Sequence, residues 1–207
     1  PSRADFIQKY NQNLAKDVKA FKAISAPTFQ QKNELLSHFS PWDLDEQFIK
    51  ISENLTQQVN NFYVQQGQKG FSDAYVRLAI DETDSKKEQA WYQKAAALKN
   101  PIALTALANT LLYGEDQNQK KIAQGIVYME QAIAQNYPEA MNMLAVWYVN
   151  ERHTAQNQQK AEALLLSATK LGSIDAMENL SRILDTPERH RWAVSAYNNG
   201  SEEDDVL

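Results

Sequence analysis

Cysteine is absent from this 207-residue sequence. Its absence excludes a disulfide framework, a thiolate nucleophile, and zinc or iron–sulfur sites held by cysteine. Histidine is almost as scarce: His38, His153 and His190 lie in three different segments, and none has the spacing to a glutamate and a second histidine that a metal-binding helix shows. We therefore expect neither a metal ion nor a cofactor.

Familiar catalytic motifs are missing as well. The sequence has no Gly-x-Ser-x-Gly elbow, no phosphate-binding loop and no dinucleotide-binding fingerprint. Close acidic pairs do occur beside the ends of predicted helices, at Asp43/Asp45, Asp81/Glu82 and Glu115/Asp116. We interpret these pairs as charges at helix ends and in solvated loops, so we expect no catalytic residue and a protein that is not an enzyme.

Glycine and proline are few, with six of each, and no apolar run approaches the length of about 18 residues needed to span a bilayer. The long stretches between them are rich in Ala, Leu, Gln, Lys and Glu, which favour helix. This composition predicts an all-α fold.

Basic clusters are scarce too. The adjacent lysines Lys86-Lys87 and Lys120-Lys121 fall in predicted loops, and most of the net charge of −5 comes from the acidic residues of segment 201–207. A nucleic-acid-binding protein normally needs clustered lysine and arginine to neutralise phosphates. We therefore expect no nucleic-acid partner.

The first third of the chain shows helical periodicity without a repeat. Apolar residues recur at spacings of three and four over residues 5–25, which predicts an amphipathic helix that ends before Pro27. A second helix is predicted to begin at Ser40, an N-cap residue followed by proline, and to end where Gly67 and Gly70 break it. Residues 1–66 are thus predicted to form an N-terminal helical unit or cap.

Beyond Gly70 the sequence repeats itself. An alanine, three further residues, a leucine and a small residue recur, with the alanines 29, 37 and 36 residues apart. The anchors of this pattern are Ala74/Leu78, Ala103/Leu107, Ala140/Leu144 and Ala176/Leu180. A second alanine series, Ala95, Ala132 and Ala168, lies eight residues before the three later anchors. Two series in phase predict stacked pairs of antiparallel helices that share one core, with alanine where helices approach closely.

The repeats resemble the Sel-one-like repeat family, longer relatives of tetratricopeptide repeats. The most specific match is KEQAWYQKAA at residues 87–96, which is similar to the second-helix signature of that family. The resemblance covers roughly residues 70–197 and implies a right-handed superhelical solenoid of helix pairs. The family's glycine after the anchor leucine is replaced by Ala79, Ala108, Ala145 and Ser181. We expect about three full repeats and one partial repeat over residues 67–200, followed by an acidic, disordered tail at 201–207.

Solenoids of this kind bind other proteins on the concave wall made by the first helix of each pair. On the side of these helices that does not carry the alanine and leucine pattern, the predicted partner-binding residues are Asn109, Tyr113, Asn142, Val146, Asn150, Glu178 and Arg182. Asparagine amides can bond a partner's main chain, and arginine can bind a carboxylate. The alternative interpretation is that these side chains are merely solvated. The aromatics Trp91 and Tyr128 occupy equivalent positions and are interpreted as packing residues.

Three functions are compatible with these features. The first is a bacterial protein, monomeric when unbound, that binds one protein partner in the periplasm or envelope, either as an immunity protein that neutralises a secreted toxin or as an envelope adaptor. The second is a cytoplasmic scaffold that joins several proteins. The third, which the missing cysteines and nucleophile elbow disfavour, is hydrolysis of cell-wall material.

Overall fold

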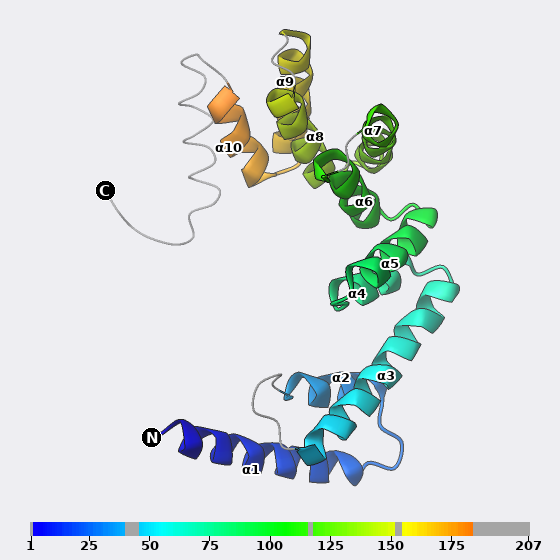
Figure 1. Ribbon diagram of the computed structural model, residues 1–207, viewed down its shortest axis with the longest axis vertical. Coiled ribbons are helices and arrows are strands. Elements are labelled where there is room, and N and C mark those ends of the chain that lie inside the picture. The colour runs from blue at the N-terminus through cyan, green and yellow to red at the C-terminus, as the bar shows by residue number, and fades with distance from the viewer. Residues whose placement is uncertain (1, 40–45, 116–117, 152–154, 184–207) are drawn as a thin grey trace. The chain divides into compact units, whose positions relative to one another are not determined.

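The computed structural model describes residues 2–39, 46–115, 118–151 and 155–183 (Figure 1). Within these ranges it contains ten helices and no strand. Its internal contacts divide the chain into two compact units, Pro1–Leu78 and Ala79–Leu207. This division falls inside the first helix of the predicted repeats, whereas the sequence placed the boundary at residue 66. The predicted boundaries at 66 and 200 stay predictions, and the predicted tail at 201–207 lies outside the described residues.

Unit 1 contains α1 (Arg3–Lys22), α2 (Phe29–Ser37), α3 (Glu46–Gln68) and most of α4 (Ser72–Ile80). Helix α1 begins with a capping box between Ser2 and Asp5, and α2 begins with one between Thr28 and Gln31. Helices α1, α2 and α3 enclose a small core of Leu14, Val18, Leu35, Phe48 and Leu55. The apolar stripe predicted for the first helix is therefore the side that packs.

Helix α2 was not predicted. It has nine residues, too few for a clear 3.6-residue period, and its signal is the Thr28/Gln31 capping box rather than its apolar pattern. The C-cap of α2 is His38. The N-cap predicted at Ser40 lies outside the described residues.

The prediction that Gly67 breaks the second long helix is wrong, because α3 continues to Gln68. Gly67 is buried, and a Cβ atom at this position would overlap the ring of Tyr75. The glycine therefore lets the tyrosine ring lie directly on the helix backbone. Gly70, whose φ is +96°, does follow the end of the helix, as expected for a residue in the left-handed region.

Unit 2 is a row of helix pairs: α5 (Ser85–Ala97), α6 (Pro101–Tyr113), α7 (Gln119–Ile133), α8 (Pro138–Glu151), α9 (Ala155–Lys170) and α10 (Ile174–Ile183). The most extensive contacts join α6 to α7 and α8 to α9, which are the first and second helices of two pairs. Contacts also join the first helices α6, α8 and α10 in sequence (Figure 1). This arrangement confirms the predicted all-α solenoid of helix pairs.

The two alanine series are buried between the packed helices. The anchors Ala103, Ala140 and Ala176 are fully buried, as are the second-series residues Ala95, Ala132 and Ala168. The four anchor leucines, Leu78, Leu107, Leu144 and Leu180, are buried as predicted. At the crossing of α6 and α7, a Cβ atom on Gly125 would lie 2.8 Å from Cγ of Leu112, so only glycine fits this contact.

The turns between pairs repeat with the same period. Lys99, Asn136 and Gly172 each follow the end of a second helix with φ values of 59°, 58° and 87°. In each turn the next residue donates its N–H to the carbonyl of the buried second-series alanine, as Asn100 does to Ala95 over 3.1 Å. Helix packing and turn geometry therefore both repeat with the period of the solenoid.

The placement of both lysine pairs in loops was wrong. Lys86-Lys87 lies in the first turn of α5, and Lys120-Lys121 lies in the first turn of α7. Each helix begins one residue after a polar N-cap: the side chain of Asp84 accepts bonds from the N–H groups of Lys86 and Lys87, and that of Asn118 accepts one from the N–H of Lys121. These cap residues, rather than the lysines, mark where the chain becomes helical.

Candidate partner-binding face

Helices α8 and α10 run side by side in the same direction, and their residues match at the repeat period. Asn142 of α8 accepts a hydrogen bond from Asn179 of α10, and Val146 of α8 and Arg182 of α10 line the same hollow. Both pairings join residues 36 or 37 positions apart, so the two helices are parallel and in register. We call the solvent-facing residues of this pair the α8–α10 face, which comprises Glu139, Val146, Asn150, Asp175, Glu178 and Arg182.

A hollow of about 360 Å³ opens on the α8–α10 face. It is lined by Val146, Val149, Asn150, Leu165, Asn179, Arg182 and Ile183, which come from α8, α9 and α10. Leu165 of α9 is nearly fully buried and belongs to the core that α8, α9 and α10 share. The hollow therefore reaches down to this core. The structure thus brings three predicted residues, Val146, Asn150 and Arg182, together around one apolar depression.

A chain of hydrogen bonds fixes the polar side of the hollow. Nδ2 of Asn179 donates to Oδ1 of Asn142 over 2.9 Å, and Nη1 of Arg182 donates to Oδ1 of Asn179 over 3.2 Å. Nη2 of Arg182 also lies 3.7 Å from the carboxylate of Glu178. Two neighbours therefore restrain the Arg182 guanidinium while its side chain remains 71% exposed.

The expectation that Asn142 is exposed was wrong, since it is 7% exposed. The contact between α8 and α10 covers it, and its amide oxygen is used by Asn179. Asn142 thus positions Asn179, which in turn accepts a hydrogen bond from Arg182. Asn179 was not predicted, although it lies 37 residues after Asn142, about one repeat further along the sequence.

The amino-terminal end of the face is acidic. Partial burial raises the pKa of Glu139 above its usual value, and repulsion from the carboxylate of Asp175 raises it further. Glu139 is exposed by area, yet the surrounding protein still removes part of the water that would hydrate its charge. Glu139 and Asp175 also lie 36 residues apart, so the in-register helices place them opposite one another.

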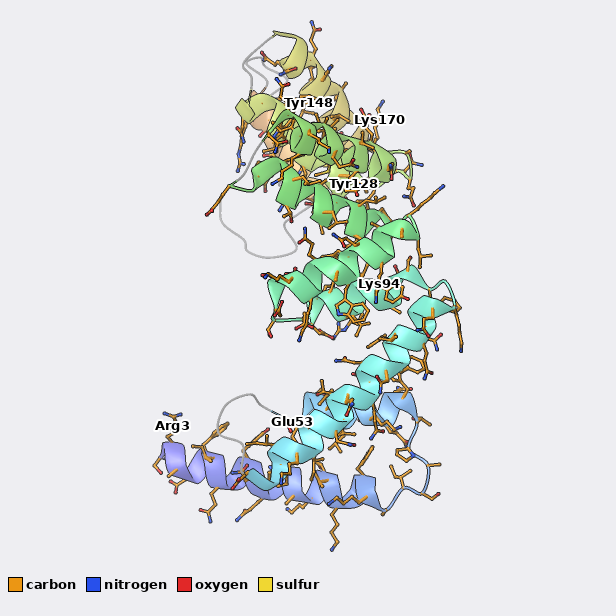
Figure 2. The ribbon with its side chains drawn as sticks, turned by 45° about the vertical axis from the view of Figure 1, so that its right-hand side comes forward. Arg3, Glu53, Lys94, Tyr128, Tyr148 and Lys170 are labelled. Atoms are coloured by element: carbon orange, nitrogen blue, oxygen red, sulfur yellow. The ribbon has the colours of Figure 1, made fainter. Side chains whose placement is uncertain are left out.

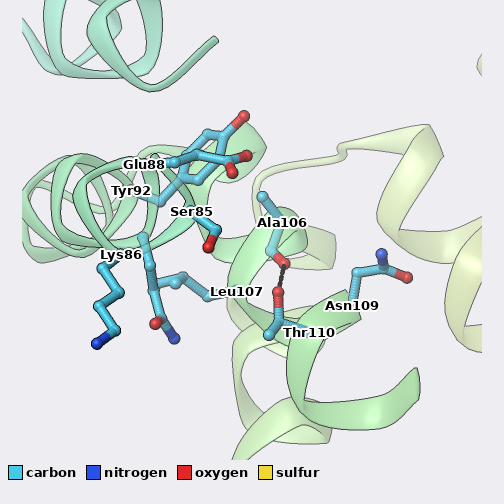
Figure 3. Close-up of a pocket in the computed structure, with 9 residues that line it drawn as sticks. Ser85, Lys86, Glu88, Tyr92, Ala106, Leu107, Asn109 and Thr110 are labelled. Atoms are coloured by element: carbon cyan, nitrogen blue, oxygen red, sulfur yellow. Dashed lines mark hydrogen bonds between the residues drawn. The ribbon is translucent and has the colours of Figure 1, made fainter. Parts of the chain in front are cut away.

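Asn109 lies at a different hollow, of about 400 Å³, between α5 and α6 (Figure 3). Its lining comes from Ser85, Lys86, Glu88, Gln89 and Tyr92 on α5 and from Ala106, Leu107, Asn109 and Thr110 on α6. Burial raises the pKa of Tyr92, and the nearby carboxylate of Glu88 adds to this effect. Tyr113 is 43% exposed and lines neither hollow. Asn109 and Tyr113 therefore do not line the hollow that Val146, Asn150 and Arg182 share.

The aromatic residues pack as predicted. Tyr128 and Tyr148, labelled in Figure 2, lie against the core shared by α6, α7 and α8. The half-buried ring of Trp91 carries the ammonium of Lys94 over its face at 4.2 Å from the ring centre. These rings are occupied by intramolecular contacts, which leaves little flat aromatic surface for a sugar or base.

Two further findings concern only the described parts of the chain. No set of three histidine, aspartate or glutamate side chains there is grouped as a metal site would require. None of the helices described is both long and apolar enough to cross a membrane.

Comparison with known proteins gives matches in structure but not in sequence. No protein-family model matches the chain, and no curated protein sequence matches it. A similar solved structure is c5321, a protective antigen of uropathogenic Escherichia coli strains with an SLR fold, with a TM-score of 0.59, 17% identity, and coverage of 84% of this chain and 40% of c5321.

Two further solved structures resemble this chain. A Sel1 repeat protein from Oxalobacter formigenes matches 93% of this chain and 57% of its own length, with a TM-score of 0.58 and 18% identity. The immunity protein PA5088 from Pseudomonas aeruginosa matches 100% of this chain and 86% of its own length, with a TM-score of 0.55 and 18% identity. The chain thus spans about half the length of c5321 and of the Oxalobacter formigenes protein. Together with the helix pairs and their period, these similarities show that the chain has the fold of Sel1-like (Sel-one-like) repeat proteins.

Proposed function

We propose that this chain is a non-catalytic binding protein of a bacterial cell, which holds a protein partner against the α8–α10 face. The observation that carries this proposal is the hollow beside the Asn142–Asn179–Arg182 chain of hydrogen bonds. An apolar depression with a few fixed polar groups at its edge is typical of a binding site. Its polar groups, two amides of α8 and α10 and one guanidinium, bind and orient; they are poor nucleophiles and poor general bases.

The specific role we propose is that of an immunity protein, which neutralises a secreted toxin in the periplasm or envelope. Support comes from the immunity protein of Pseudomonas aeruginosa, whose structure corresponds to this one along all of this chain and most of its own length. A fold can be kept while function changes, so the role needs its own test. An envelope adaptor would use the same face, and a cytoplasmic scaffold would need a second binding surface.

Affinity capture from the native bacterial extract tests the binding role. The bait is the wild-type chain, compared with Val146→Asp/Arg182→Ala, which alters the hollow, and with Asn109→Ala/Thr110→Ala, which alters the other one. We expect a protein that is retained by the wild type and by the control but lost with the first variant. Retention by all three baits would contradict the proposed face, and retention by none would contradict the binding role.

The immunity role makes a narrower prediction about the captured protein. Expressed alone in the native compartment it should arrest growth, and coexpression of this chain should restore growth. The two proteins should form a one-to-one complex in solution. Rescue by the Val146→Asp/Arg182→Ala variant as efficient as by wild type would contradict neutralisation through this face, and a captured protein without toxicity would favour the adaptor or scaffold.

A further inference from the structure

The α8–α10 face has two parts at a fixed separation. Glu139 and Val146 lie seven residues apart on α8, and Asp175 and Arg182 lie seven residues apart on α10. Seven residues make nearly two helical turns, so each pair lies on one side of its helix at an axial distance of about 10 Å. The acidic pair Glu139/Asp175 therefore lies about 10 Å from the hollow along both helices.

The hollow favours an apolar side chain. Val146, Val149, Leu165 and Ile183 supply apolar lining from three helices. Its volume of about 360 Å³ is near the lower end of the range for binding pockets, about 300 to 1,000 Å³. An apolar side chain that fills this space would bury its own surface and the apolar lining of the hollow, and that burial is the main source of affinity in such contacts.

The charges of the face favour a cation at its other end. Arg182 and Glu178 lie within 3.7 Å, so these two charges largely offset each other beside the hollow. Glu139 and Asp175, in the first turns of α8 and α10, are both carboxylates, so neither offsets the other, and the charge of Asp175 disfavours that of Glu139. A lysine or arginine side chain between them would replace this repulsion with two attractions.

The groups at the rim of the hollow favour an extended segment. The amide of Asn150 and the exposed guanidinium of Arg182 can bond main-chain groups of a partner. An extended segment presents free main-chain carbonyls, whereas those of a helix are already bonded within it. In the polyproline II form of an extended segment, three residues make one turn and span about 9 Å, so side chains three residues apart lie on the same side at nearly the distance between the two parts of the face.

We infer that the α8–α10 face binds an extended segment of its protein partner in the polyproline II conformation, with an apolar side chain in the hollow and, three residues away, a lysine or arginine between Glu139 and Asp175. This inference rests on the proposed function and adds the chemistry of the partner to it. The basic residue lies at the end of the face away from Arg182, so these like charges are about 10 Å apart along the helices, which exceeds the Debye length at physiological salt, roughly 8 Å.

A displayed library of random twelve-residue peptides tests the inference on the full chain. Selection on the wild type should enrich peptides with lysine or arginine three positions from a large apolar residue. Selection on Glu139→Lys/Asp175→Lys should shift that position to aspartate or glutamate. A matched control, Glu88→Lys/Glu130→Lys, changes the net charge equally on the second helices α5 and α7 and should leave the preference for basic residues in place.

The best wild-type peptide is then measured by fluorescence anisotropy. We expect its affinity to fall about tenfold or more with Glu139→Lys/Asp175→Lys and with Val146→Asp, and to change little with the control. A gain of acidic peptides by the reversed variant also shows that the variant is folded. Circular dichroism checks the fold of Val146→Asp.

Other results overturn the inference in distinguishable ways. Peptides that bind the reversed variant and the wild type equally, acidic peptides on the wild type, or no enrichment at all would each refute the proposed partner chemistry. The binding role would still stand if the native partner were captured by the wild type and lost with Val146→Asp/Arg182→Ala. If that capture also failed, the proposed function itself would be wrong.

Discussion

The side-chain amide of Asn179 donates a 2.9 Å hydrogen bond to Oδ1 of the buried Asn142, and this bond ties α10 to α8. Asn179 also lines the hollow, and along their helices both residues lie between the acidic end of the face and Val146 or Arg182, so the bond keeps α8 and α10 in register next to both parts of the face. Because the bond is largely shielded from water, losing one partner leaves the other poorly solvated.

Asn179→Ala should therefore lower the free energy of unfolding by about 1 to 3 kcal/mol, since the amide oxygen of Asn142 loses its donor. Urea unfolding followed by circular dichroism measures the effect. The control is Asn150→Ala on the exposed part of α8, which should change stability by less than about 0.5 kcal/mol. Equal stabilities of the two variants would show that the Asn142–Asn179 bond contributes nothing.

The crossing of α6 and α7 makes a second prediction. Gly125→Ala should lower the free energy of unfolding by about 1 to 3 kcal/mol, although alanine normally favours a helix over glycine, because its Cβ would collide with Leu112 and the carbonyl of Ala108. Combining it with Leu112→Ala should cost less than the sum of the two single changes, since the smaller side chain makes room. Strict additivity, or stabilisation by Gly125→Ala alone, would contradict the close approach.

The N-cap of α6 leads to a third prediction. The side chain of the buried Asn100 accepts bonds from the N–H groups of Ile102 and Ala103, at 3.0 and 3.2 Å. Asn100→Ala should cost about 0.5 to 2 kcal/mol of unfolding free energy. Asn118→Ala, which removes the exposed N-cap of α7, should cost less, because water can replace an exposed cap. The opposite order in thermal or urea unfolding would refute this account of the cap.

The repeats could be predicted from the sequence because their cause is local and recurring. A close approach between helices accepts only small side chains, so Ala95, Ala132 and Ala168 appear as a period along the chain. The turns between helix pairs repeat with the same period, but the residue types at these turns do not reveal it. Gly172 is an obvious residue for a positive φ, but Lys99 and Asn136 adopt it too, and the packing on either side imposes that conformation on them.

The α8–α10 face could be predicted only in part, because some of its features depend on contacts between helices. Val146 and Arg182 follow from helical periodicity, since each lies off the alanine and leucine pattern of its own helix. Burial of Asn142 depends on the neighbouring helix α10, which the periodicity of α8 does not contain. The same holds for Gly67, whose place inside α3 depends on the ring of Tyr75. Local patterns identified the helices, and contacts between helices decided which residues reach the surface.

The acidic end of the face makes a prediction about pH. Asp175→Asn should lower the pKa of Glu139, because it removes the repulsion that contributes to the raised value. Nuclear magnetic resonance of the glutamate side-chain carbonyl carbon, followed as the pH is changed, measures this pKa directly. The partial burial of Glu139 stays, so its pKa should remain above the usual glutamate value in the variant.

The raised pKa also fixes the direction of the pH effect on stability. In the folded chain Glu139 binds a proton more readily than in the unfolded chain, so its charge disfavours folding at neutral pH. That penalty is lost as the pH falls through the raised pKa. Wild type should therefore gain stability relative to Asp175→Asn over that interval, and a basic peptide bound to the face should lower the pKa of Glu139 in the wild type. An unchanged pKa in the variant would mean that Glu139 and Asp175 do not interact, and the cation site inferred between them would lose its basis.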